Sequence, residues 1–187
     1  TLGSLATQSF TGGGGNDQIT TAAAPTSGTI AAGAGTDTLI LGATTHMDTA
    51  AEAARFTGFE TLRTPGSFNL NLKDGLTGLQ VAATTAAATF NNMDATQAAN
   101  VDILGTINTN GITFLLETTS GTSDVFTADV GNNLAAAGLA LDIDTITLNG
   151  FETINLNSVH GSSASVTENR TTTIEKITSD VATAVNL

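Results

Sequence analysis

Two glycine-rich turns that end in aspartate are the segments of this chain best suited to chemistry. Residues 12–17 read GGGGND and residues 32–37 read AGAGTD, and each turn has an apolar residue two positions after its aspartate. Glycine lets the backbone turn sharply and direct its carbonyl oxygens to one side, and aspartate adds a charged oxygen. Since calcium takes about six to eight oxygen ligands, these turns predict a calcium site.

The spacing of the two turns predicts how they meet. One turn supplies only half of a calcium cage, and Asp37 follows Asp17 by 20 positions (37 − 17), close to one coil of a strand-and-turn repeat. We therefore expect one calcium ion between turns 12–17 and 32–37. The intervening corner, residues 22–28, lacks the ligand pattern, so the opposite edge is expected to be free of metal. Ala32 replaces the first glycine of the second turn.

Composition favours calcium over other charged partners. Seventeen acidic residues against five basic ones give a net charge of -12, which disfavours nucleic acid and anionic membranes. The chain has no cysteine, which excludes disulfides, thiolate metal sites and a cysteine nucleophile. No stretch approaches the ~18 apolar residues of a membrane-spanning helix. Because 40% of the residues are hydrophobic, disorder does not explain the acidity.

The elements that must position these turns are short strands. Apolar residues alternate in the segments 68–72, 79–83, 101–104, 112–116, 125–130 and 141–148, with turn signals between them. We predict an all-β fold, a parallel β-solenoid of the β-roll or β-helix type, in preference to a β-sandwich. One or two short helices are expected, from a capping box at Thr49–Glu52 towards Arg55 and at residues 94–100. Residues 1–45 would form the calcium-binding coils, and residues 46–187 would continue the same domain.

A second repeat carries glutamate. Residues 58–61 and 150–153 both read GFET, and residues 173–177 are a weaker copy. Glu60 and Glu152 could be a carboxylate pair for glycoside hydrolysis. The repeat itself explains their recurrence better, with glutamate on the outer face of a strand, and we expect no enzyme activity.

Other candidate groups are scattered. Asp142 and Asp144 share one face of a predicted strand and are candidates for a further calcium site with Asp124 or Asp129; the alternative is a solvated strand face. His46 and His160 belong to no metal or triad motif, and we expect both on the surface.

The order and spacing of five segments resemble repeats-in-toxin (RTX) surface-layer proteins of Gram-negative bacteria. The segments are 12–17, 33–43, 58–63, 121–126 and 150–155, and residues 12–19 fit the RTX nonapeptide G-G-x-G-x-D-x-U-x at every fixed position. The resemblance implies a secreted, calcium-dependent β-solenoid, exported by a type I system, that self-assembles into a cell-surface lattice. By the same resemblance, the calcium ligands are Gly13, Gly15, Asp17, Gly33, Gly35 and Asp37.

The resemblance also sets the expected partners and the alternatives. The partners would be other copies of the chain and a cell-surface polysaccharide, with no nucleic acid and no membrane insertion. The turn at Gly121–Asp124 has one residue too many for the RTX pattern, although Asp124 remains a candidate ligand. We expect the chain to be a segment of a longer protein. It could then be a calcium-folded appendage of a secreted enzyme, or a repeat adhesin.

Overall fold

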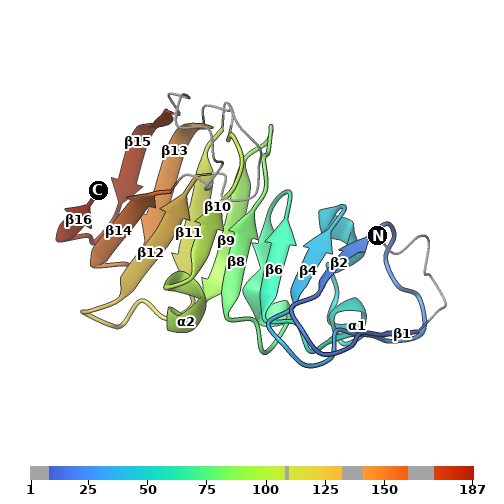
Figure 1. Ribbon diagram of the computed structural model, residues 1–187. Coiled ribbons are helices and arrows are strands. Elements are labelled where there is room, and N and C mark those ends of the chain that lie inside the picture. The colour runs from blue at the N-terminus through green and yellow to red at the C-terminus, as the bar shows by residue number, and fades with distance from the viewer. Residues whose placement is uncertain (1–8, 108–109, 132–140, 160–170) are drawn as a thin grey trace.

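The computed structural model describes residues 9–107, 110–131, 141–159 and 171–187, which stack as successive strands along one long axis (Figure 1). The strands of the main stack are β1 (Phe10–Thr11), β2 (Gln18–Thr21), β3 (Ile30–Ala31), β4 (Thr38–Leu41), β5 (Phe56–Thr57), β6 (Thr61–Thr64), β7 (Phe68–Asn69), β8 (Gly78–Val81), β9 (Ala88–Met93), β10 (Val101–Ile103), β11 (Ile112–Leu116), β12 (Val125–Val130), β13 (Leu141–Asn149), β14 (Thr153–Ser158), β15 (Thr172–Ser179) and β16 (Ala184–Asn186).

The chain is an all-β parallel solenoid. The even-numbered strands form one eight-stranded sheet that runs from β2 to β16. The odd-numbered strands form a three-stranded sheet, β1-β3-β5, and a five-stranded sheet, β7-β9-β11-β13-β15. Every pairing among the described strands is parallel, so each coil adds one strand to each of two layers. The predicted fold class is confirmed, and the hairpin-based sandwich is wrong.

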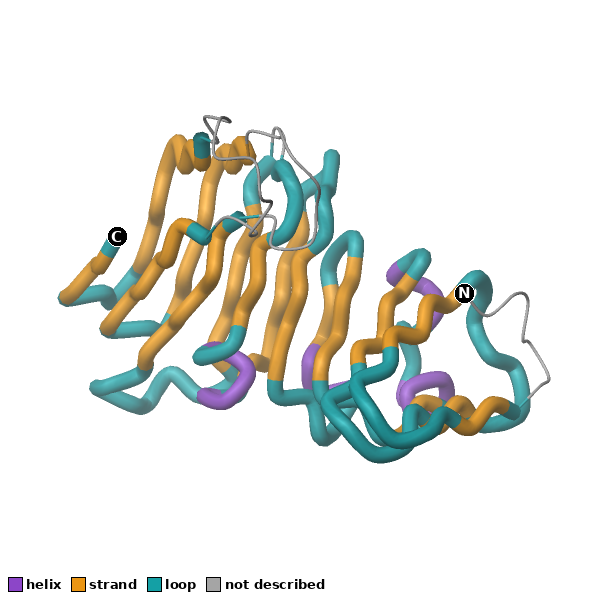
Figure 2. The backbone as a smooth tube through the Cα atoms, viewed as in Figure 1, coloured by secondary structure: helices purple, strands orange, loops and turns teal. Residues whose placement is uncertain are grey.

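The coils differ in length along the stack. Hydrogen-bonded positions on neighbouring coils are 20 residues apart at Asp17 and Asp37, 17 apart at Glu60 and Thr77, and 31 apart at Glu152 and Thr183. Loops make up much of each coil at the N-terminal end, and long strands dominate at the C-terminal end (Figure 2). The pairing of β4 with β6 carries the eight-stranded sheet across the boundary expected at residue 45.

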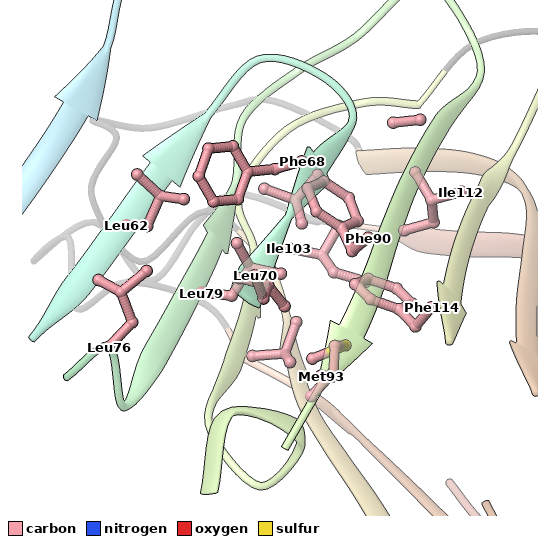
Figure 3. Packing of buried hydrophobic residues seen from close by; sticks show 14 of the residues in the cluster. Leu62, Phe68, Leu70, Leu76, Leu79, Phe90, Met93, Ile103, Ile112 and Phe114 are labelled. Atoms are coloured by element: carbon pink, nitrogen blue, oxygen red, sulfur yellow. The ribbon is translucent and has the colours of Figure 1, made fainter. Parts of the chain in front are cut away.

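The core lies between the two layers. Inward-facing residues alternate with outward-facing ones, as in β12, where Phe126 is buried and Val125 is exposed. Phe90 and Phe114, in the five-stranded sheet, stack with their ring centroids 5.3 Å apart (Figure 3). Phe114 also contacts Phe126 of the other sheet at 4.8 Å, and Phe126 contacts Phe151 at 5.3 Å. This aromatic column joins the two layers.

Short helices fill some of the corners between strands. They are η1 (Thr44–His46), α1 (Ala50–Ala53), η2 (Leu70–Leu72) and α2 (Ala95–Ala98). The predicted capping box at Thr49 and Glu52 is present in α1, and Asp94 and Gln97 form another at α2. Both α-helices exist but are shorter than expected. Among the described residues, no helix has the length and apolar character needed to cross a membrane.

Candidate metal centre

The two glycine turns lie on adjacent coils, one directly against the other. The first joins β1 to β2, and the second joins β3 to β4. Their backbones are hydrogen-bonded together, from Gly15 N to Ala34 O at 2.8 Å and from Ala34 N to Gly13 O at 3.0 Å. The 20-residue spacing therefore corresponds to one coil, as the sequence predicts, and the six residues that resemble RTX ligands are brought to one corner of the solenoid.

The close stacking of these turns depends on glycine in the second turn. Gly33 and Gly35 have φ values of 114° and 147°, in a region that side chains disfavour. A Cβ on Gly33 would collide with the carbonyl oxygen of Gly13, and a Cβ on Gly35 would collide with that of Gly15. Ala32 stands in place of the first glycine, and its side chain is buried in the core.

Asp37 is the most distinctive group at this corner. Its side chain is fully buried, with 0% of its surface exposed. Its Oδ1 accepts the backbone N–H of Asp17 at 2.7 Å, whereas its Oδ2 is buried without a hydrogen-bond partner. A buried carboxylate oxygen without a partner costs roughly 1–3 kcal/mol or more, because it has lost its hydration and gained nothing in exchange. A cation beside Oδ2 would remove that cost.

A third carboxylate, that of Glu60, lies at the same corner, and we call these three acidic residues the carboxylate column. Glu60, on the next coil, accepts the backbone N–H of Asp37 through Oε2 at 2.8 Å. Asp17, Asp37 and Glu60 therefore follow one another at the same corner, on coils roughly 4.8 Å apart. The column concentrates negative charge where a divalent cation would be most stabilising.

The donor set at this corner fits calcium. Gly13, Gly15, Gly33 and Gly35 are exposed, so their turns are accessible from solvent, while Asp37, at the end of the second turn, is buried. Among the described residues, no three acidic or histidine side chains are grouped to hold a metal ion. A site here must therefore use backbone carbonyls with one or two carboxylates, which are ligands that a hard cation accepts.

The structure changes the interpretation of the two GFET repeats. Glu60 and Glu152 do not lie on the outer face of a strand. Each immediately precedes a strand, is half-buried, and binds a backbone N–H of the preceding coil. Four strand-to-strand steps separate β6 from β14, which is roughly 19 Å at the usual strand spacing. Carboxylates that hydrolyse glycosides are roughly 5–10 Å apart, so these two cannot act as such a pair.

The remaining candidate carboxylates are not gathered into one site. Asp124 immediately precedes β12 in the eight-stranded sheet, whereas Asp142 and Asp144 lie within β13 in the five-stranded sheet. Asp142 is exposed, and Asp144 accepts a hydrogen bond from the hydroxyl of Thr145 at 3.2 Å. Within the described residues these three do not form a metal-binding group.

Of the two histidines, the structure describes His46. His46 is half-buried, and its Nδ1 lies 2.8 Å from the hydroxyl oxygen of Thr21 on the preceding coil. This contact links residues of two adjacent coils. His160 lies outside the described residues.

A polar row on the outer face of the eight-stranded sheet was not anticipated from the sequence. Arg63 Nε donates to Gln80 Oε1 at 2.8 Å, and Gln80 Nε2 donates to Asp102 Oδ2 at 3.1 Å. Gln80, Asp102 and Asp129 contribute to the lining of a cavity of about 350 Å³. Burial, with a smaller contribution from the charge of Asp129, raises the pKa of Asp102. In the sequence, each of these four residues is the last but one of its strand.

Searches against protein-family models, curated proteins and solved structures gave no match for this chain.

Proposed function

We propose that this chain is a structural module, a calcium-stabilised β-solenoid that forms part of a secreted surface-layer protein and assembles with its own copies into a cell-surface lattice. The observation that carries the calcium part is the buried Asp37 Oδ2, which has no hydrogen-bond partner. It lies at a corner where two glycine turns stack. Calcium bound there would join two coils and neutralise part of a carboxylate column.

The acidic composition supports the same proposal. With 17 acidic and 5 basic residues, most carboxylates of this chain cannot be paired with a cationic side chain. Stacking the coils in parallel brings Asp17, Asp37 and Glu60 to one corner, and a divalent cation offsets the repulsion between their like charges. Because a ligand that binds only the folded chain stabilises it by mass action, calcium would act as the staple that disulfides provide in other exported proteins.

The assembly part rests on the resemblance of the five sequence segments to surface-layer proteins and on the shape of the fold. A parallel solenoid presents flat faces and repeating corners, which suit ordered contacts between copies. Electron microscopy of the full-length protein tests this directly. We expect ordered two-dimensional sheets in calcium and dispersed particles after chelation. Dispersed particles in both conditions would contradict the lattice.

Hydrogen exchange tests the calcium part separately. Amides of residues 10–40 should exchange more slowly in calcium than in EDTA, because the ion ties the first two coils together. Amides of residues 88–93 and 112–116, which lie in the aromatic core, serve as the internal control and should change little. Equal protection of residues 10–40 in both conditions would refute calcium binding at this corner.

A further inference from the structure

The corner that precedes β12 has the same construction as the corner that precedes β4. Asp124 donates its backbone N–H to Glu152 Oε2 at 2.7 Å, as Asp37 does to Glu60 Oε2 at 2.8 Å. In return, the carbonyl oxygen of Asp124 accepts the backbone N–H of Glu152 at 2.9 Å, and that of Asp37 accepts the N–H of Glu60 at 3.1 Å. Each aspartate is thus held by a glutamate of the following coil.

The GFET repeat explains why the two corners coincide. Its glycines, at 58 and 150, both have positive φ values, of 70° and 88°. Its phenylalanines, at 59 and 151, are both buried in the core, with 2% and 0% of their surfaces exposed. Since the phenylalanine anchors the turn from within, the next residue is placed at the corner, and glutamate there reaches the preceding coil. In both copies of the repeat, the glutamate side chain accepts the backbone N–H of an aspartate one coil earlier. We call this arrangement the clamp.

Both clamped aspartates also have an oxygen without a partner. Asp124 Oδ2 is buried and accepts no hydrogen bond, which is also true of Asp37 Oδ2. The carboxylate of Asp124 lies over Gly121, in the space where a Cβ would be. The residues of the turn before Asp124 are exposed from 117 to 123, so a ligand can reach this turn from solvent.

We propose that the Asp124 corner is a second calcium site, with Asp124 as its carboxylate ligand and Glu152 as the residue that positions Asp124. The proposal deepens the proposed function and rests on it. The Gly121–Asp124 turn does not have the spacing of the RTX nonapeptide, so this site would follow from the clamp and not from that motif. Four strand-to-strand steps separate β4 from β12, which places the two sites roughly 19 Å apart.

Calcium titration calorimetry on the 187-residue chain, with CaCl₂ as the probe, counts the sites. The wild type should bind two equivalents, and Asp37→Asn and Asp124→Asn should each bind one. Glu175→Gln is the matched control, because Glu175 is exposed in β15 and the change removes the same charge; it should bind two. Circular dichroism checks that each variant is folded.

Hydrogen exchange shows which of the two calcium sites a variant has lost. In Asp124→Asn, calcium should no longer protect residues 119–126 but should still protect residues 10–40. A wild type that binds one equivalent, with calcium protection confined to residues 10–40, would overturn the second site and leave the proposed function standing. A wild type that binds no calcium would overturn both.

Two changes at Glu152 test its positioning role. Glu152→Ala removes the acceptor for the Asp124 N–H and should weaken calcium at the second site roughly 10–100-fold, as is usual when a residue that orients a metal ligand is lost. Glu152→Gln keeps an acceptor oxygen and should weaken it much less. Equal losses in the two variants would overturn the positioning role, since the hydrogen bond would then not matter.

Discussion

Replacing Asp37 by asparagine should stabilise the protein when calcium is absent and destabilise it when calcium is present. The side chain of Asp37 is fully buried, and Oδ2 has no hydrogen-bond partner. Asparagine can still accept the N–H of Asp17 through its own oxygen, and it removes one charge from the column with Asp17 and Glu60. In EDTA we therefore expect Asp37→Asn to be the more stable protein by about 1 kcal/mol, because a neutral amide is less costly to bury than a carboxylate.

Calcium should change the sign of that difference. At a concentration one hundred times its Kd, a bound ion stabilises the wild type by about 2.7 kcal/mol, and the variant gains none of this. The variant should then be less stable by about 1.7 kcal/mol. For a chain of this size, 1 kcal/mol shifts the Tm by about 2–4 °C, so the variant should melt roughly 2–4 °C higher in EDTA and roughly 3–7 °C lower in calcium.

Thermal unfolding followed by far-ultraviolet circular dichroism measures both differences, since the chain has no tryptophan or tyrosine to serve as a fluorescent probe. Glu175→Gln, an exposed change of the same charge, is the control and should show no reversal. If Asp37→Asn shifted the Tm by the same amount in EDTA and in calcium, Asp37 would have only a structural role, and the reasoning would be refuted.

Three further changes test other parts of the structure. Gly33→Ala should destabilise the first two coils and abolish their calcium protection in hydrogen exchange, because the new Cβ would collide with Gly13 O at a φ of 114°; unchanged protection would contradict this. Phe114→Ala should cost about 3–5 kcal/mol in chemical denaturation. That cost should be equal with and without calcium, since Phe114 lies in the aromatic column and not at a corner; a calcium-dependent cost would contradict this. The raised pKa of Asp102 means that its charged form destabilises the fold, so stability is lost as pH rises through that pKa. Asp102→Asn should therefore be more stable than the wild type at pH 7, and the advantage should vanish below the usual carboxyl pKa of about 3.9; the same advantage at both pH values would contradict this.

The alternation of apolar residues and the spacing of the glycine turns predicted most of the fold. The segment 125–130 is β12 to the residue, because its apolar residues recur at every second position and parallel coils bury one face. The segment 68–72 was predicted as one strand, and this is wrong after Asn69, where η2 begins. The side chain of Asn69 accepts the N–H of Asn71 at 3.1 Å, and such local hydrogen bonds compete with strand pairing. The spacing of apolar residues carries no information about these local hydrogen bonds.

The candidate site was predictable only where the chain repeats at a constant length. Asp17 and Asp37 are one 20-residue coil apart, so their adjacency could be inferred from the spacing. Glu60 follows Asp37 by 23 residues, in a coil that also contains α1, and its contact with Asp37 depends on a register that the sequence does not state. For the same reason the grouping of Asp142 with Asp124 could not be judged, because it depends on which sheet each strand joins.

The most direct test of the account is a crystal structure of the chain grown with calcium, with anomalous diffraction data to locate the ion. We predict an anomalous peak at the corner shared by turns 12–17 and 32–37, at a bonding distance of about 2.3–2.6 Å from Asp37 Oδ2. An ordered water hydrogen-bonded to that oxygen, with no anomalous signal at a saturating calcium concentration, would contradict the account.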